Sequence, residues 1–70
     1  MKIKSRITGV LYEGDDMVFI MNTLQSGMYI KNNGVLVDCF WHDKRNSLCF
    51  IFNREETYLL YDAWCKHELK

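Results

Sequence analysis

Six residues of this chain combine aromatic rings with positive charge, which is the chemistry that a nucleotide ligand requires. They are Trp41, His42, Lys44 and Arg45 in one short stretch, with Tyr12 and Arg6 as neighbours from the N-terminal segment. An aromatic plane stacks on a base, and a guanidinium fork binds phosphate oxygens. The set therefore predicts a ligand-binding site. A solvated basic turn, with Trp41 filling the core, remains the alternative.

A second set of candidates for chemistry, which shares His42 with the first, contains the side chains that could ligate a metal or act as nucleophiles: Cys39, His42, Cys49, Cys65 and His67. They form no paired Cys-x-x-Cys or His-x-x-x-His spacing, so we expect no structural zinc. A catalytic thiolate would need an activating base and an orienting third group, and the sequence supplies neither. We therefore expect a protein without enzymatic activity, metal or cofactor, whose three cysteines are reduced.

The aromatic and basic stretch lies in a predicted β-hairpin. Two runs rich in β-branched and aromatic residues, Val35 to His42 and Ser47 to Asn53, flank a polar turn at residues 43–46. The turn predicts four facing pairs, His42 with Ser47, Trp41 with Leu48, Cys39 with Phe50 and Val37 with Phe52. The hairpin is thus the element that must position the candidate ligand site.

Alternation of side chains along this hairpin separates two faces. One face is apolar and is expected in the core: Val35, Val37, Cys39, Trp41, Leu48, Phe50 and Phe52. The other face is mixed and is expected against a partner or ligand: Leu36, Asp38, Phe40, His42, Ser47, Cys49 and Ile51. Burial of Asp38 and Ile51 beneath other elements would overturn this assignment.

Residues 1–70 as a whole predict one small α+β domain in the order β-β-α-β-β-α, with antiparallel hairpins and two helices packed on one face. Lys2 to Tyr12 has a polar face and is expected as a strand at the edge of the sheet. A turn at residues 13–16 leads to Met17 to Met21, whose nearly continuous apolar sequence predicts a strand inside the sheet.

Two asparagines mark the expected helix starts. Asn22 precedes Gln25 by three residues and Asn53 precedes Glu56 by three, the spacing of an N-terminal cap. We expect the first helix to end at Lys31 and the second near Glu68. The packing face of the first helix is predicted as Leu24, Gly27 and Met28, with Gly27 allowing close approach to the sheet and Tyr29 and Ile30 at an interface. The second helix is predicted to pack through Tyr58, Leu60, Tyr61, Trp64, Cys65 and Leu69.

Composition limits the classes of partner. Hydrophobic residues make up 49% and aromatic residues 14% of the chain, more than so small a core hides, so we expect a homo-oligomer. Nine basic and nine acidic residues cancel, which argues against binding to extended nucleic acid. The sequence contains no apolar run of about 18 residues and no signal peptide, so we expect a cytoplasmic protein without membrane contact.

From Phe19 onward the chain resembles a small family of unknown function encoded by bacteriophages and prophages of Gram-positive hosts. The resemblance lies in the strand-to-helix entry from Phe19 to Leu24, the Tyr29-Ile30 pair, the hairpin, and a final aromatic helix containing Trp64. Lys2 to Asp16 adds a strand that many such sequences lack. The resemblance implies a phage origin and a compact α+β fold, and it transfers no site residues.

Two functions follow as hypotheses. In size and character the chain looks like phage proteins that counteract host defence by sequestering a cyclic oligonucleotide signal in pockets between protomers, as a sponge does. Neutral charge with abundant Tyr, Trp and Arg favours this first hypothesis. The alternative is a small inhibitor that lays an exposed strand or the mixed hairpin face onto a host enzyme or defence protein. Both hypotheses place the protein in the cytoplasm of the host cell.

Overall fold

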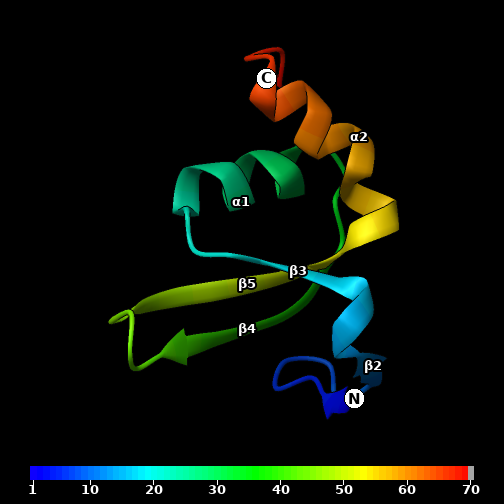
Figure 1. Cartoon of the computed structure of the whole chain (residues 1–70), viewed down its shortest axis with the longest axis vertical. Coiled ribbons are helices and arrows are strands. Elements are labelled where there is room, and N and C mark those ends of the chain that lie inside the picture. The colour runs from blue at the N-terminus through cyan, green and yellow to red at the C-terminus, as the bar shows by residue number, and fades with distance from the viewer. Residues whose placement is uncertain (70) are drawn as a thin grey trace.

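The predicted hairpin lies at the centre of the structure, a computed structural model that describes residues 1–69. β4 (Leu36–His42) and β5 (Ser47–Asn53) pair antiparallel, and β3 (Met17–Ile20) pairs antiparallel with the other side of β5. The sheet therefore has the order β3-β5-β4 (Figure 1). Together with two helices and a separate pair of strands, this sheet makes up the predicted α+β fold, which is thus confirmed.

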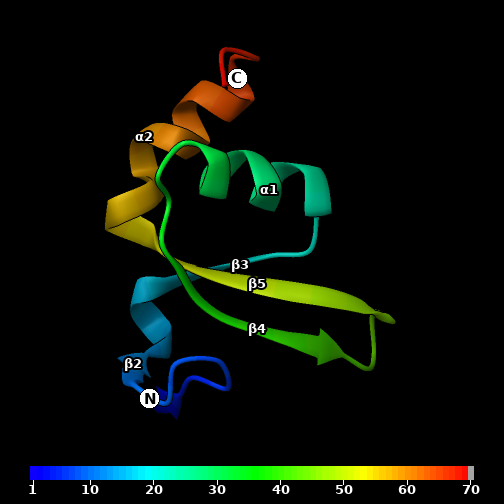
Figure 2. The same cartoon turned by 180° about the vertical axis from the view of Figure 1, so that it is seen from behind.

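Both helices begin where the asparagine caps predict. α1 (Thr23–Lys31) starts after Asn22, whose side-chain oxygen accepts from the Gln25 N–H at 3.1 Å. α2 (Arg54–Cys65) starts after Asn53, whose side-chain oxygen accepts from the Glu56 N–H at 3.1 Å. This helix ends at Cys65, before the expected Glu68. The two helices lie on the same side of the sheet, as Figures 1 and 2 agree. Neither helix is long and apolar enough to cross a membrane.

The N-terminal segment differs from the single strand predicted for residues 2–12. β1 (Lys2–Lys4) and β2 (Leu11–Glu13) pair with each other instead, and a short 3₁₀ turn, η1 (Gly14–Asp16), leads into β3. The chain reverses because the Ser5 hydroxyl accepts from the N–H groups of Ile7 and Thr8, while Gly9 adopts a φ of +76°. Figure 2 shows this β1–β2 pair, the N-terminal ribbon, on the side of the sheet opposite the helices.

Both faces of the sheet are therefore covered, which corrects the predicted assignment of the hairpin faces. One core forms beneath the helices around Ile20, Tyr29 and Phe52. A second core forms against the N-terminal ribbon and contains Cys49 and Ile51, both fully buried. Asp38, Cys49 and Ile51 of the mixed face, which was expected to meet a partner, are buried inside the chain because the ribbon covers them.

A β-bulge between Leu36 and Asp38 places on opposite faces two residues that were predicted to share the mixed face. Three predicted pairs are confirmed, His42 with Ser47, Trp41 with Leu48 and Cys39 with Phe50. The fourth is wrong, since Phe52 faces Leu36 and not Val37. The extra residue shifts the alternation, so that Leu36 packs with the helix-side core while Asp38 faces the ribbon. Strict alternation would have placed both side chains on one face.

The packing face of α1 also differs from the prediction. Tyr29 and Ser26 are fully buried, and the Tyr29 ring meets Phe52 edge-on with centroids 5.2 Å apart. Leu24 and Gly27 are exposed instead. On α2, Leu60 and Trp64 pack against the core as expected, whereas Tyr58, Tyr61 and Cys65 are exposed. The helices thus leave two tyrosines facing outward beside the sheet.

Removal of the Ser26 hydroxyl should leave stability unchanged or raise it by up to about 1 kcal/mol. The hydroxyl is buried and has no hydrogen-bond partner within residues 1–69, so Ser26→Ala removes an unsatisfied polar group from a helix. Thr57→Val is the matched control, because the buried Thr57 hydroxyl donates to the Asn53 carbonyl at 2.7 Å and its loss should cost about 1 kcal/mol. Urea unfolding measures both. A clear loss of stability in Ser26→Ala would contradict this account.

Candidate functional site

The six residues predicted to bind a ligand do not form one site. Trp41 is 53% exposed and, by strand alternation, lies on the sheet face opposite Phe40 and His42. The Arg6 guanidinium lies 4.6 Å from the centroid of the Phe40 ring, on the ribbon side. The alternation of β4 thus points Trp41 away from Arg6.

The hairpin turn holds the other predicted cations in the open. Lys44 and Arg45 are exposed, and the Arg45 N–H donates to His42 Nδ1 at 3.3 Å. This contact orients the imidazole within the turn. Trp41, Lys44 and Arg45 therefore form an exposed hairpin tip and not a pocket, which matches the alternative of a solvated basic turn except that Trp41 is outside the core.

Tyr12 is buried and forms a hydrogen bond with Asp38. Its hydroxyl donates to Asp38 Oδ2 at 2.9 Å, while the N–H groups of Arg6 and Cys39 donate to Oδ1, each at 2.9 Å. Burial acts to raise the pKa of Asp38, but these three hydrogen bonds and the Arg6 charge outweigh it and hold that pKa below its usual value. Burial and the bond to Asp38 raise the pKa of Tyr12 to about 12. This pair therefore belongs to the core and not to a ligand site.

The cysteines stay free and do not cluster with other ligands. Cys49 is buried, Cys39 is half-buried and Cys65 is exposed. Burial raises the pKa of the Cys49 thiol, which makes it a poorer nucleophile. Across residues 1–69 no three His, Cys, Asp or Glu side chains lie close enough together to hold a metal ion.

A groove of about 590 Å³ runs along β3, and sequence reasoning did not identify it. β3 was expected inside the sheet, but among residues 1–69 it is an edge strand that pairs only with β5. The groove is lined by Val18, Phe19, Ile20, Met21, Asn22, Gln25, Tyr29, Arg54, Thr57, Tyr58 and Tyr61. Most of these side chains are apolar or aromatic, and they come from β3 and both helices.

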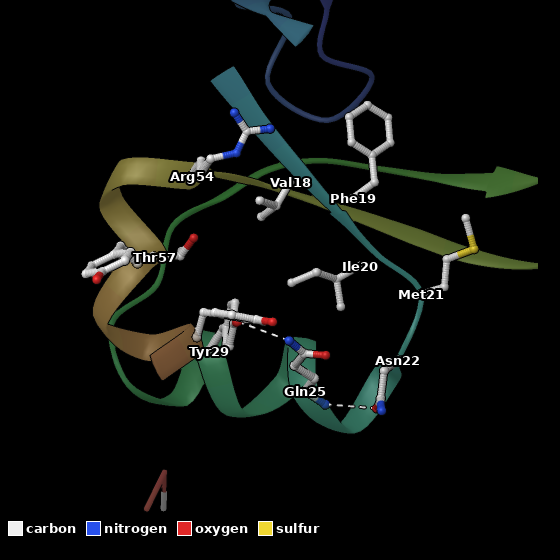
Figure 3. Close-up of a pocket in the computed structure, with 11 residues that line it drawn as sticks. Val18, Phe19, Ile20, Met21, Asn22, Gln25, Tyr29, Arg54 and Thr57 are labelled. Atoms are coloured by element: carbon white, nitrogen blue, oxygen red, sulfur yellow. Dashed lines mark hydrogen bonds between the residues drawn. The ribbon is translucent and has the colours of Figure 1, made fainter. Parts of the chain in front are cut away.

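Figure 3 shows how this groove is built. Val18 and Ile20 lie on the side of β3 that faces the helices, and Phe19 lies on the opposite side. Gln25 Nε2 donates to the Tyr29 hydroxyl at 3.0 Å and closes the α1 wall. On α2, Tyr58 and Tyr61 are 66% and 56% exposed. The groove therefore has an ordered floor and two rings free to cover a bound chain.

Arg54 closes one end of the groove. Its two terminal nitrogens donate to the carbonyls of Asp15 and Met17, each at 3.1 Å, and so tie α2 to the start of β3. Arg54 also lines a second hollow of about 160 Å³, together with Asp16, Asn53 and Glu55. The apolar groove therefore ends at a small polar hollow that contains two carboxylates.

The exposed edge of β3 lacks the usual protection. Natural edge strands carry charges, prolines or bulges that prevent another strand from adding. The sequence from Met17 to Met21 contains no charged residue and no proline. The apolarity that predicted an interior strand is thus equally consistent with an edge that another chain covers.

Comparison of the chain with protein-family models, curated proteins and solved structures finds no match. The resemblance to a phage family therefore stays a prediction. The function is argued below from the groove and the strand edge.

Proposed function

We propose that this chain is a non-catalytic binding module that captures an extended segment of a partner protein by adding it as a strand to the edge of β3. The observation that carries the proposal is the uncharged edge strand beside an apolar groove. Edge backbone groups supply hydrogen bonds to the added strand, and side-chain pockets supply selectivity. This develops the inhibitor hypothesis, in which an exposed strand lies against another protein.

The dimensions of the groove support a peptide as the occupant. Alternate side chains of an added strand would lie on the helix side of the sheet, next to Val18 and Ile20 and under the tyrosines of α2. A volume of about 590 Å³ accommodates a few apolar side chains, within the range of about 300–1,000 Å³ that ligand pockets span. Exposed aromatic side chains are the type that most often dominates binding energy at protein interfaces.

A nucleotide fits this groove less well. Arg54 is its single cation, and both terminal nitrogens of Arg54 already donate to backbone carbonyls. Phosphate groups would therefore meet little positive charge among apolar walls. The cyclic-oligonucleotide sponge depends instead on the exposed tip around Trp41, Lys44 and Arg45, and that hypothesis, like the homo-oligomer, stays a prediction.

Selection from a library of random displayed peptides tests the proposal. We expect the chain to enrich peptides in which apolar residues alternate, and we expect those peptides to slow hydrogen exchange at the amides of β3. Protection of β3 is the specific sign of strand addition, because only a paired edge loses contact with water. Enriched peptides that leave the exchange of residues 17–20 unchanged, or no enrichment at all, would overturn the proposal.

Matched variants on α2 locate the binding surface. Tyr58→Ala combined with Tyr61→Ala should weaken binding of a selected peptide at least about tenfold, since each truncation removes an exposed ring from the groove. Leu59→Ala is the control, because Leu59 is 75% exposed on the same helix and does not line the groove. Fluorescence anisotropy with a labelled peptide measures both. Equal losses in the two variants would place the peptide elsewhere.

A further inference from the structure

We propose that the segment captured at β3 carries a lysine or arginine directly after its apolar stretch, and that this cation enters the small hollow lined by Asp16 and Glu55. This inference rests on the proposed function, and it names the chemistry of the partner. Its basis is the continuity between the apolar groove and the polar hollow, which share Arg54 as a common wall.

The charge around the hollow favours a cation. Asp16 and Glu55 line it, and within residues 1–69 neither carboxylate has an ion-pair partner. Asp15 and Glu56 are exposed close by in sequence, and the nearby positive charges are Arg54 and the N-terminal ammonium, which lies 3.9 Å from Asp15 Oδ2. Four carboxylates against these two positive charges still leave a net negative field at this end of the groove, which complements a basic side chain.

The position of the hollow determines where the cation must lie in the partner sequence. Arg54 contacts the carbonyl of Met17, so the hollow adjoins the first residue of β3. A strand that runs antiparallel to β3 reaches Met17 with its C-terminal end. Antiparallel pairing is the commoner arrangement and is the one β3 already makes with β5. The basic residue is therefore expected after the apolar stretch of the partner and not before it.

Arg54 does not prevent this arrangement. Its terminal nitrogens point at the backbone carbonyls of Asp15 and Met17, which hold the guanidinium against the strand. A lysine or arginine side chain also has a long apolar stem that can lie along the apolar groove while its charged end reaches the carboxylates. The apolar groove and the polar hollow beside it thus fit one segment whose apolar residues are followed by a basic residue.

The test uses the tightest peptide from the selection in three versions, with lysine, methionine or glutamate immediately after its apolar stretch. Lysine should bind about twofold to fivefold more tightly than methionine at low salt, and glutamate should bind more weakly than both. Added salt should reduce the preference for lysine, because the carboxylates are exposed. Calorimetry or anisotropy gives the three dissociation constants.

Charge-neutralising variants assign the preference to the hollow. Asp16→Asn combined with Glu55→Gln should remove the preference for lysine while the methionine peptide binds as before. Asp43→Asn combined with Glu68→Gln changes the net charge equally at exposed positions outside both hollows and should keep the preference. Equal binding of the lysine and methionine peptides, or a preference that survives Asp16→Asn with Glu55→Gln, would overturn the inference. Peptides that protect β3 without preferring lysine would leave the proposed function standing, whereas absence of any peptide binding would overturn that function itself.

Discussion

Asp38→Ala should destabilise the chain by about 3–5 kcal/mol, the largest effect that we expect from a single side chain. Asp38 is fully buried, and its carboxylate accepts from two backbone N–H groups and from the Tyr12 hydroxyl. Alanine would leave the buried Tyr12 hydroxyl and two part-buried N–H groups without this acceptor, and each buried donor left unpaired costs about 1–3 kcal/mol. A domain of this size has only about 4–10 kcal/mol of stability in total. Urea unfolding followed by circular dichroism should therefore show a marginal or unfolded variant.

Asp43→Ala is the matched control for this loss. Asp43 is an exposed aspartate in the hairpin turn, so its removal should change stability by no more than about 0.5 kcal/mol. Tyr12→Phe should lie between the two, at about 1–2 kcal/mol, because it removes one donor and leaves the carboxylate two others. Comparable losses in Asp38→Ala and Asp43→Ala would show that the buried carboxylate does not hold the ribbon to the sheet.

The same carboxylate makes stability depend on pH. Its pKa in the folded chain lies below the unfolded value of about 3.9, so its ionised form binds the ribbon more favourably than its protonated form. The contribution is complete above about pH 4 and is lost as the pH falls through the lower, folded pKa. Asp38→Asn keeps the shape of the side chain but does not titrate, so its free energy of unfolding should depend less on pH below about pH 4. If Asp38→Asn lost stability at low pH as steeply as the unchanged chain, that loss would belong to other carboxylates.

Local features of this fold could be predicted from the sequence because short-range physics determines them. Asn22 and Asn53 cap their helices through bonds to N–H groups three residues away, so the sequence carries both partners of each cap. The hairpin turn likewise sets the register of its nearest pairs. The register changes at Val37, where the Ser5 hydroxyl donates to the Val37 carbonyl and the long-range contact accompanies a bulge.

The site could not be predicted because apolarity does not distinguish a strand buried by its own chain from an edge strand. Met17 to Met21 has the composition of an interior strand, yet β3 lies at the edge. The groove also depends on Tyr58 and Tyr61, which a helical wheel assigns to the packing face of α2 although the structure exposes them. The signal that was available is the absence of charge from Met17 to Met21, which is unusual for an exposed edge.

Two glycines should respond to alanine with opposite signs, and they reverse the roles that the helix pattern suggests. A Cβ at Gly34 would lie 2.7 Å from the Tyr29 carbonyl oxygen and 3.2 Å from Leu60 Cδ1. The Gly34 N–H also donates to that oxygen at 2.7 Å, so the segment after α1 cannot move away from Tyr29 without breaking this hydrogen bond. Gly34→Ala should therefore cost about 2–3 kcal/mol through overpacking.

Gly27→Ala should instead stabilise the chain by about 0.5–1 kcal/mol. Gly27 was expected to bring α1 close to the sheet, but a Cβ there would meet no atom within 4 Å apart from the backbone of its own helix. Alanine would reduce the backbone entropy lost on folding in the middle of a helix, without any new contact. Urea unfolding of both variants measures the two changes in the free energy of unfolding. These changes should have opposite signs and differ by about 3 kcal/mol. A destabilised Gly27→Ala would mean that this face of α1 is covered. A neutral Gly34→Ala would mean that the segment after α1 can move away from Tyr29 and Leu60 to make room for the added Cβ.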